Sequence, residues 1–385
     1  MYPTLSEFLK TLGINIQLPI QMFGFFVAIA FAVAAYLVSL ELKRKQALGI
    51  LKPSYKKIIV GAPATITDYI TSAIIGFFIG FKLIYMALNY SEFSNDPQST
   101  LLSFKGNLLG GIVVAAIMTY LRFRESKAQL LPKPEERKIE LKPADHVGNI
   151  ILLGVVGGFL GAKIFHNLEN PSEFVADPIG ALFSFSGLTF YGGLIVAAVL
   201  IIRYGRKNGL PAIHITDACA PALMLSYGVG RIGCQISGDG DWGIVNLAPK
   251  PNWMSFLPDW MWSFKFPHNV NNEGVPIPGC VGRWCHELPQ PVFPTSFYET
   301  CMAIVLFAIL WSIRKKITTP GLLFSIYLIM NGAERFIIES IRVNSLYNIF
   351  GIGITQAQII STILMFLGIF GIWYTKKIAI TNEKR

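Results

Sequence analysis

Apolar runs close to the length of a membrane span recur along this chain, and they constrain its fold more than any other feature. A helix needs about 20 apolar residues to cross the hydrocarbon core of a bilayer. Only 15% of the 385 residues are charged, whereas a soluble domain carries about 25%. Backbone polar groups in lipid must be satisfied within their own segment, which favours helices. The sequence therefore predicts an all-α, polytopic transmembrane helical bundle.

Nine segments have the length and apolar character of spans. They are residues 22–40, 68–89, 107–122, 146–166, 188–204, 216–236, 297–313, 321–341 and 354–375. The first is followed by Lys43, Arg44 and Lys45. A secretory signal would carry its basic residues before the apolar run and a small-residue cleavage site after it. We therefore interpret the first run as a true span.

The basic residues indicate an orientation. With the N-terminus outside, the inner segments hold 23 lysines and arginines and the outer segments hold five. Such an excess on one side is the positive-inside pattern. Inner loops that face anionic lipid also explain the pI of about 9.3 without a nucleic-acid partner. We expect one multi-pass membrane domain over residues 1–385, with the C-terminus in the cytoplasm.

Two stretches of the chain resemble each other at an offset of 81 residues. Gly80-Phe81-Lys82-Leu83 corresponds to Gly161-Ala162-Lys163-Ile164. With one inserted residue, Gly110-Gly111 corresponds to Gly192-Gly193. Each unit, 68–122 and 146–204, holds two spans, so both copies have the same orientation. The pattern predicts a tandem duplication of a helical hairpin and not the inverted repeat of many transporters.

Residues 237–295 form a long segment rich in Pro, Trp, Gly and Asn between two spans. We expect it to be an extracytoplasmic cap or arm region. It holds Cys280 and Cys285, which we predict to form a disulfide, because oxidation is possible on that side. A metal site with His268 and His286 is the alternative, although the spacing matches no standard zinc pattern. No metal is expected.

Arginines mark a possible anion site near the outer ends of two spans. Arg335, Glu339 and Arg342 share one helix face by their i,i+4 and i,i+3 spacing. Their two positive charges against one negative charge predict a positive surplus, although a structural ion pair remains an alternative. Arg231 lies near the outer end of the sixth span. Two arginines at one depth suit a phosphate, which guanidinium binds bidentately.

Two further positions open spans on the outer side. Glu299 could be a base, an arginine partner, or a first-turn acid favoured by the helix dipole. Tyr191 stands just before Gly192-Gly193. An interfacial aromatic residue followed by a packing pair is the simpler interpretation of that segment.

Together these segments resemble the prolipoprotein diacylglyceryl transferase family of bacterial inner membranes. The resemblance rests on Gly192-Gly193-Leu194-Ile195, Gly230-Arg231-Ile232-Gly233, Pro294 to Glu299, and Gly332 to Arg342. It implies transfer of a diacylglyceryl group from phosphatidylglycerol to the lipobox cysteine thiol beside a prolipoprotein signal peptide, with release of glycerol phosphate. No cofactor is implied. The implied catalytic residues are Tyr191, Arg231, Asp239, Glu299, Arg335 and Glu339. The implied substrate-binding residues are Arg231, Arg335, Gly192, Gly193, Gly243 and Arg342.

The chain departs from the family pattern at several positions. Tyr191 stands where the family usually has His, and Cys234 stands where it usually has Asn. The family typically has seven spans, and the duplication would add two. These departures leave open a catalytically altered or inactive family member. A membrane transporter that uses the buried charges as a substrate path is a separate alternative.

Overall fold

The computed structural model describes residues 1–183, 189–344, 346–349 and 352–383, and it is mostly helical. Its α-helices are α1 (Leu5–Thr11), α2 (Met22–Ala47), α3 (Ile66–Leu88), α4 (Tyr90–Asn95), α5 (Pro97–Leu102), α6 (Leu108–Gln129), α7 (Val147–Glu169), α8 (Pro171–Ala176), α9 (Pro178–Phe183), α10 (Phe190–Lys207), α11 (Ala212–Ser237), α12 (Thr295–Ile313), α13 (Leu322–Glu339) and α14 (Gln356–Glu383). Its strands are β1 (Ser54–Val60), β2 (Glu135–Leu141), β3 (Val275–Pro276), β4 (His286–Glu287), β5 (Leu346–Ile349) and β6 (Ile352–Thr355).

Each predicted span coincides with one long helix, but the helices differ in how apolar they are. Five described segments are long and apolar enough to cross a membrane: α2, α3, Pro143–Glu169, α12 and Gln356–Lys377. Helices α6, α10, α11 and α13 fall outside that group. The chain is thus a helical membrane protein, and the full count of nine spans stays a prediction.

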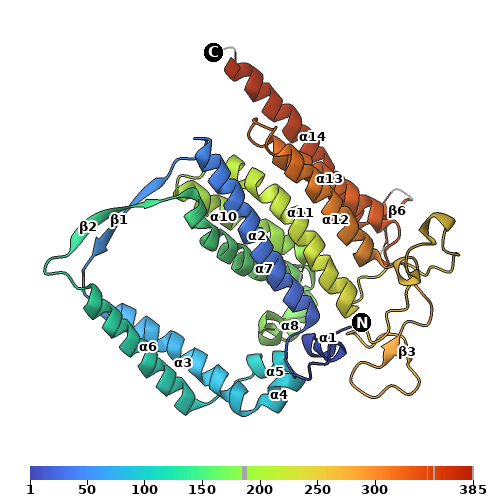
Figure 1. Cartoon of the computed structure of the whole chain (residues 1–385), viewed down its shortest axis with the longest axis horizontal. Helices are drawn as coiled ribbons and strands as arrows, with labels where there is room; N and C mark the ends of the chain where they lie inside the picture. The colour runs from blue at the N-terminus through green and yellow to red at the C-terminus, as the bar shows by residue number, and fades with distance from the viewer. Residues whose placement is uncertain (184–188, 345, 350–351, 384–385) are drawn as a thin grey trace.

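The centre of the bundle is built from α2, α11, α12 and α13 (Figure 1). Small side chains let the helices approach: Gly233 packs against Phe23 and Phe26 of α2, and Gly228 packs against Ala303 of α12. Helix α14 packs along α13, and α7 and α10 form a pair beside α2 and α11. Close helix contacts through small residues are the usual means of association in a membrane.

The two ends of the bundle differ in composition. We call the end where α2 finishes with Arg44 and Lys45 the basic end, and the end with the N-terminus and residues 237–295 the loop end (Figure 1). At the basic end Asp217 accepts hydrogen bonds from the backbone N–H groups of Gly321 (2.8 Å) and Phe324 (3.0 Å). Lys45 lies 3.6 Å from the same carboxylate. This buried group therefore ties α2, α11 and the start of α13 together.

Two helical hairpins have matching construction. α3 packs on α6 and α7 packs on α10. A Cβ on Gly80 would meet the carbonyl oxygen of Gly110 at 2.3 Å, and one on Gly161 would meet that of Gly192 at 2.5 Å. The short helices α4 and α5 correspond to α8 and α9 at the offset of 81 residues. In Figure 1 the α3/α6 hairpin stands apart from the rest of the bundle.

An antiparallel ribbon of β1 and β2 joins the α3/α6 hairpin to the rest of the bundle (Figure 1). This ribbon departs from the all-α fold expected from the sequence. Its strands come from separate loops about 80 residues apart, so no local pattern reveals that they pair. β3 pairs with β4, and β5 pairs with β6, in two further small sheets.

The predicted disulfide between Cys280 and Cys285 is confirmed, with a Cα–Cα distance of 5.6 Å. It lies in the long segment at the loop end. Phe266, Leu288 and Val292 form a small apolar core in that segment, with Trp242 and Phe264 packed against it. The segment is therefore an ordered cap, and it brings loop residues against the ends of α11, α12 and α13.

Candidate active site

Arginines and carboxylates from separate elements meet at the loop end of the bundle. Arg231 lies in the last turns of α11, and Glu299 lies in the first turns of α12. Arg335 and Glu339 lie near the end of α13, Arg342 follows it, and Asp241 lies in the loop after α11. Tertiary packing thus assembles residues that are more than 100 positions apart in the chain. We call these six residues the arginine–carboxylate cluster.

Glu299 is at the centre of the cluster and is fully buried. Its Oε1 accepts a hydrogen bond from Nη1 of Arg342 at 2.8 Å and lies 3.8 Å from Nη1 of Arg335. Its Oε2 accepts a hydrogen bond from the Tyr227 hydroxyl at 2.5 Å and forms an ion pair with Arg231. Of the three roles that the sequence left open for Glu299, the geometry favours that of arginine partner.

Asp241 links two of the arginines from the loop side. Its Oδ1 accepts a hydrogen bond from Arg342 at 2.5 Å, and its Oδ2 pairs with Arg231. The hydroxyls of Thr295 and Ser296 donate to its backbone oxygen at 2.7 and 2.9 Å. Burial would raise the pKa of Asp241, but Arg231 and Arg342 outweigh it and lower the pKa below the usual value. Asp241 is therefore held as a carboxylate between the two guanidinium groups.

The third arginine, Arg335, pairs with Glu339 one helical turn away, at 3.0 Å. Tyr191 at the start of α10 lies within interacting range of both side chains. The structure therefore places Tyr191 beside the arginine–carboxylate cluster. Gly192 and Gly193 instead face α7, where a Cβ would meet the carbonyl oxygens of Gly161 and Gly158 at 2.7 and 2.6 Å. Their visible role is close packing of α10 on α7.

Gly243 positions Arg342. The two residues form a backbone bridge, and a Cβ on Gly243 would meet the carbonyl oxygen of Ile341 at 2.5 Å. Only a glycine lets the loop pass so close to the end of α13. Gly243 thus acts on the site through the backbone.

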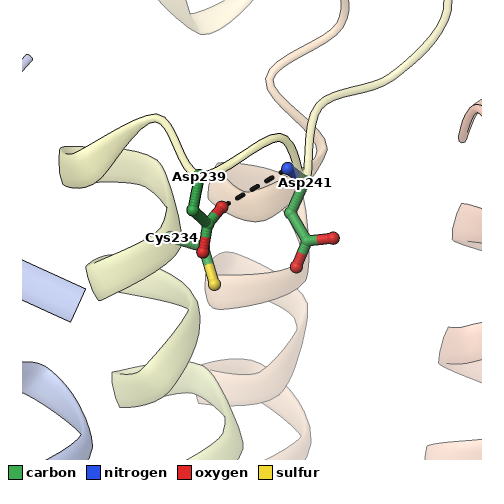
Figure 2. A group of neighbouring side chains, drawn as sticks. All are labelled: Cys234, Asp239 and Asp241. Atoms are coloured by element: carbon green, nitrogen blue, oxygen red, sulfur yellow. Dashed lines mark hydrogen bonds between the residues drawn. The ribbon is translucent and has the colours of Figure 1, made fainter. Parts of the chain in front are cut away.

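Asp239 lies beside Cys234 at the end of α11 (Figure 2). Its Oδ1 accepts a hydrogen bond from the backbone N–H of Asp241 at 3.3 Å. Burial, and then the charge of Asp241, raise the pKa of Asp239. The ligand atoms of Cys234, Asp239 and Asp241 lie within 4.8 Å of one another. Both oxygens of Asp241 are already bound to arginines, so a cation there would compete with two guanidinium groups.

The predicted positive surplus around Arg335 and Arg342 is wrong. Three arginines face the three carboxylates of Asp241, Glu299 and Glu339, and the carboxyl group of Glu334 lies beside them. The expected surplus rested on the charges of α13 alone, whereas the balancing carboxylates come from α12 and from the loop. Asp241 and Tyr227 were missed because they lie on other segments. Glu334 lies on α13 itself, one residue before Arg335, and was missed because only the residues three and four positions apart on the face of Arg335 were counted. Asp241 had one available signal, its place two residues after Asp239.

Glu334 differs from the other carboxylates of the site. It is 3% exposed, and among the residues that the structure describes neither of its oxygens has a hydrogen-bond partner. Tyr227 lies near it but donates its hydroxyl proton to Glu299. Nη1 of Arg335 and Nε of Arg342 also lack hydrogen-bond acceptors within the described part of the chain. The site therefore holds free donors and a free carboxyl group next to its ion pairs.

Known protein sequences are similar to the part of the chain that builds this site. The family profile described as prolipoprotein diacylglyceryl transferase matches residues 128–374. The α3/α6 hairpin lies almost entirely before that match. Every cluster residue, with Tyr191 and Glu334, lies inside it.

Three relatives carry the name phosphatidylglycerol–prolipoprotein diacylglyceryl transferase. That of Leptospira interrogans is 26% identical over 290 residues, which cover 63% of this chain and 82% of the relative. That of Neisseria meningitidis is 29% identical over 228 residues, 57% of this chain and 75% of the relative. That of Clostridium tetani is 26% identical over 229 residues, 59% of this chain and 79% of the relative. The chain belongs to the prolipoprotein diacylglyceryl transferase family.

Proposed function

We propose that this protein transfers a diacylglyceryl group from phosphatidylglycerol to the lipobox cysteine thiol of a prolipoprotein. The names of its relatives carry this activity and both substrates. The observation that supports it most directly is the convergence of Arg231, Arg335 and Arg342 at one end of a membrane bundle. A phospholipid headgroup reaches that depth, and guanidinium groups bind phosphate oxygens in pairs.

The free donors of Arg335 and Arg342 give the phosphate a place to bind. Their existing ion pairs hold the guanidinium groups in position before the substrate arrives, which is the preorganisation that favours a developing anion. The leaving phosphate gains negative charge as its ester bond breaks. A buried arginine site stabilises that charge more than water does.

The chemistry needs little else from the protein. The thiol sulfur of the preprotein forms a bond to the saturated glycerol carbon. The carbon–oxygen bond to phosphate breaks, and its electron pair stays on the phosphate oxygen. The thiol proton leaves to a carboxylate, for which Glu299, Glu339, Asp239 and Glu334 are within the site. Tyr191 orients the thiol or a glycerol oxygen, in the place where the family usually has His.

The finer topology belongs to the same proposal. We infer nine spans, with the loop end outside and the basic end in the cytoplasm of a bacterial inner membrane. The basic residues at the ends of α2, α10 and α12 support this orientation. The matching α3/α6 and α7/α10 hairpins support a tandem duplication. The family match begins at residue 128, after nearly all of the first copy, which supports the first copy as the added one.

Complementation tests the function. The gene is expressed in a bacterium depleted of its own transferase, and the mass of one preprotein is measured. We expect a mass increase equal to one diacylglyceryl group on the lipobox cysteine. A well-expressed, membrane-inserted protein that leaves the preprotein mass unchanged would favour an inactive member of the family.

A further inference from the structure

The β1/β2 ribbon has an internal symmetry that the helices alone do not show. Lys57 of β1 pairs with Lys138 of β2, and these residues are separated by the repeat offset of 81. If each residue is replaced by its counterpart 81 positions away on the other strand, the pair Ser54–Leu141 becomes the pair Val60–Glu135. That pair is also present. The ribbon therefore has a local two-fold axis between Lys57 and Lys138. In an antiparallel pair such an axis is perpendicular to the plane of the strands.

The same axis determines how the ribbon lies relative to the membrane. β1 precedes α3 and β2 precedes α7 by five residues each. Both hairpins thus start at the ribbon and run in the same direction. A two-fold axis that relates two hairpins running in the same direction must be parallel to their helices. The ribbon is therefore parallel to the membrane surface, and Figure 1 shows it running across the helix direction.

One face of such a ribbon must point toward the bilayer, and the two faces differ. Directly opposed residues share a face, and successive residues alternate. The first face, here called the apolar face, carries four aliphatic side chains and two cations: Ile58, Val60, Ile139, Leu141, Lys56 and Arg137. Glu135 pairs with Arg137 at 3.1 Å at the strand end. This face keeps one positive charge in excess.

The second face, here called the mixed face, is electrically balanced. It carries Lys57, Lys138, Glu136 and Glu140, and Lys57 pairs with Glu136 at 3.0 Å. Its two larger apolar side chains, Tyr55 and Ile59, are 68% and 66% exposed. Internal ion pairs suit a face that points to water. A bare two-stranded ribbon is only marginally stable without a surface to cover it.

We propose that the apolar face of the β1/β2 ribbon lies on the surface of an anionic bilayer. The segments 48–65 and 130–146 together hold seven basic and four acidic residues. Each lysine or arginine near an anionic lipid surface gains about 1 kcal/mol. Aliphatic side chains next to cations suit the boundary between headgroups and acyl chains. The ribbon is thus a lipid-contacting strap that holds the first hairpin at a set position beside the bundle.

Limited trypsin digestion of the full chain tests this placement. The protein is inserted in nanodiscs of phosphatidylcholine, with or without about a third of phosphatidylglycerol, so that both membrane faces are open to the protease. Cleavage after Lys56, Lys57, Arg137 and Lys138 is followed by mass spectrometry. We expect anionic lipid to slow these cuts about fivefold or more. Equal rates in both discs would overturn the proposal.

Two neighbouring substitutions provide a matched pair. Ile58→Asp places a carboxylate on the apolar face, and Ile59→Asp places the same group on the mixed face one residue away. We expect Ile58→Asp to abolish the slowing and Ile59→Asp to keep it. Loss of protection in Ile59→Asp alone would mean that the mixed face is the covered one. Protection that persists in detergent would show that protein, and not lipid, covers the ribbon. Neither readout depends on lipid transfer, so the proposed function can fail or hold independently.

Discussion

The guanidinium group of Arg335 interacts with two carboxylates at once. It pairs with Glu339 at 3.0 Å and lies 3.8 Å from Glu299. Lysine would keep the charge but lose the planar fork that binds two oxygens together. We expect Arg335→Lys to insert and fold normally, yet to lose transferase activity by about 100-fold. Turnover is measured with purified protein, and the melting temperature serves as the control. A rate equal to that of the parent protein would show that Arg335 does not bind the phosphate.

Tyr191 is the site residue that departs from the family pattern, and its hydroxyl lies within range of Arg335 and Glu339. We expect Tyr191→Phe, which removes only that hydroxyl, to slow transfer by roughly tenfold or more, the worth of one hydrogen bond to a charged group. Tyr191→His restores the usual family residue and should retain appreciable activity. If the phenylalanine variant works at the parent rate, Tyr191 is only an aromatic residue at the membrane interface.

The third prediction for a single residue concerns Glu334. Its carboxyl group is buried without a hydrogen-bond partner in the described part of the site, and we expect it to exchange a proton during the reaction. Glu334→Gln keeps the shape but cannot do so. We expect kcat to fall by about tenfold or more with KM nearly unchanged. A proportional rise in KM instead would assign Glu334 to substrate binding.

At the scale of elements, glycines determine how closely the helices of each hairpin approach. A Cβ on Gly110 would meet Ile84 at 2.6 Å, and one on Gly111 would meet Phe77 at 2.8 Å. We expect Gly110→Ala with Gly111→Ala to destabilise the α3/α6 hairpin by about 1–3 kcal/mol through overpacking. The specific activity of folded protein should not change, because this hairpin lies apart from the arginine–carboxylate cluster.

The control for that prediction is Gly158→Ala in α7. Its added Cβ would meet nothing within 4 Å, so it tests helix propensity alone and should be neutral or slightly stabilising. Thermal unfolding in detergent compares the variants. A loss of specific activity in well-folded Gly110→Ala, Gly111→Ala protein would show that both hairpins serve the site.

At the scale of the whole molecule, the first repeat unit can be removed as one piece. Deleting residues 54–134 takes out 81 residues and leaves β2 to connect α2 with α7. The end of α2 already contacts the turn before α7, so the remaining loop joins neighbours. We expect the shortened chain to insert and to keep transferase activity within about threefold of the parent.

Purified yield, melting temperature and lipid transfer are measured for this deletion. An inserted but inactive protein would mean that the first unit contributes to catalysis from a distance. Such a result would also contradict the inference that the first repeat unit was added to an already complete enzyme.

Much of the helical architecture follows from the sequence, because membrane burial imposes a simple rule on each segment alone. Every predicted span coincides with a helix, and five of them are apolar enough to cross a membrane. The disulfide could also be predicted, since only Cys280 and Cys285 lie in the long loop segment. The membership of Arg231, Glu299 and Arg335 in one site came from motifs whose depth could be counted along the helices.

The charge balance of the site and the pairing of the strands depend on contacts between distant segments, so only the tertiary structure determined them. Asp241 and Glu299 cancel the positive surplus expected from α13 alone, because these carboxylates come from a loop and another helix. Cross-strand pairing made the β1/β2 ribbon, whose strands carry no helical or alternating signal strong enough to identify them. Local periodicity reports the environment of one segment. Ion pairs and strand pairs are properties of two segments, and only the folded chain brings those together.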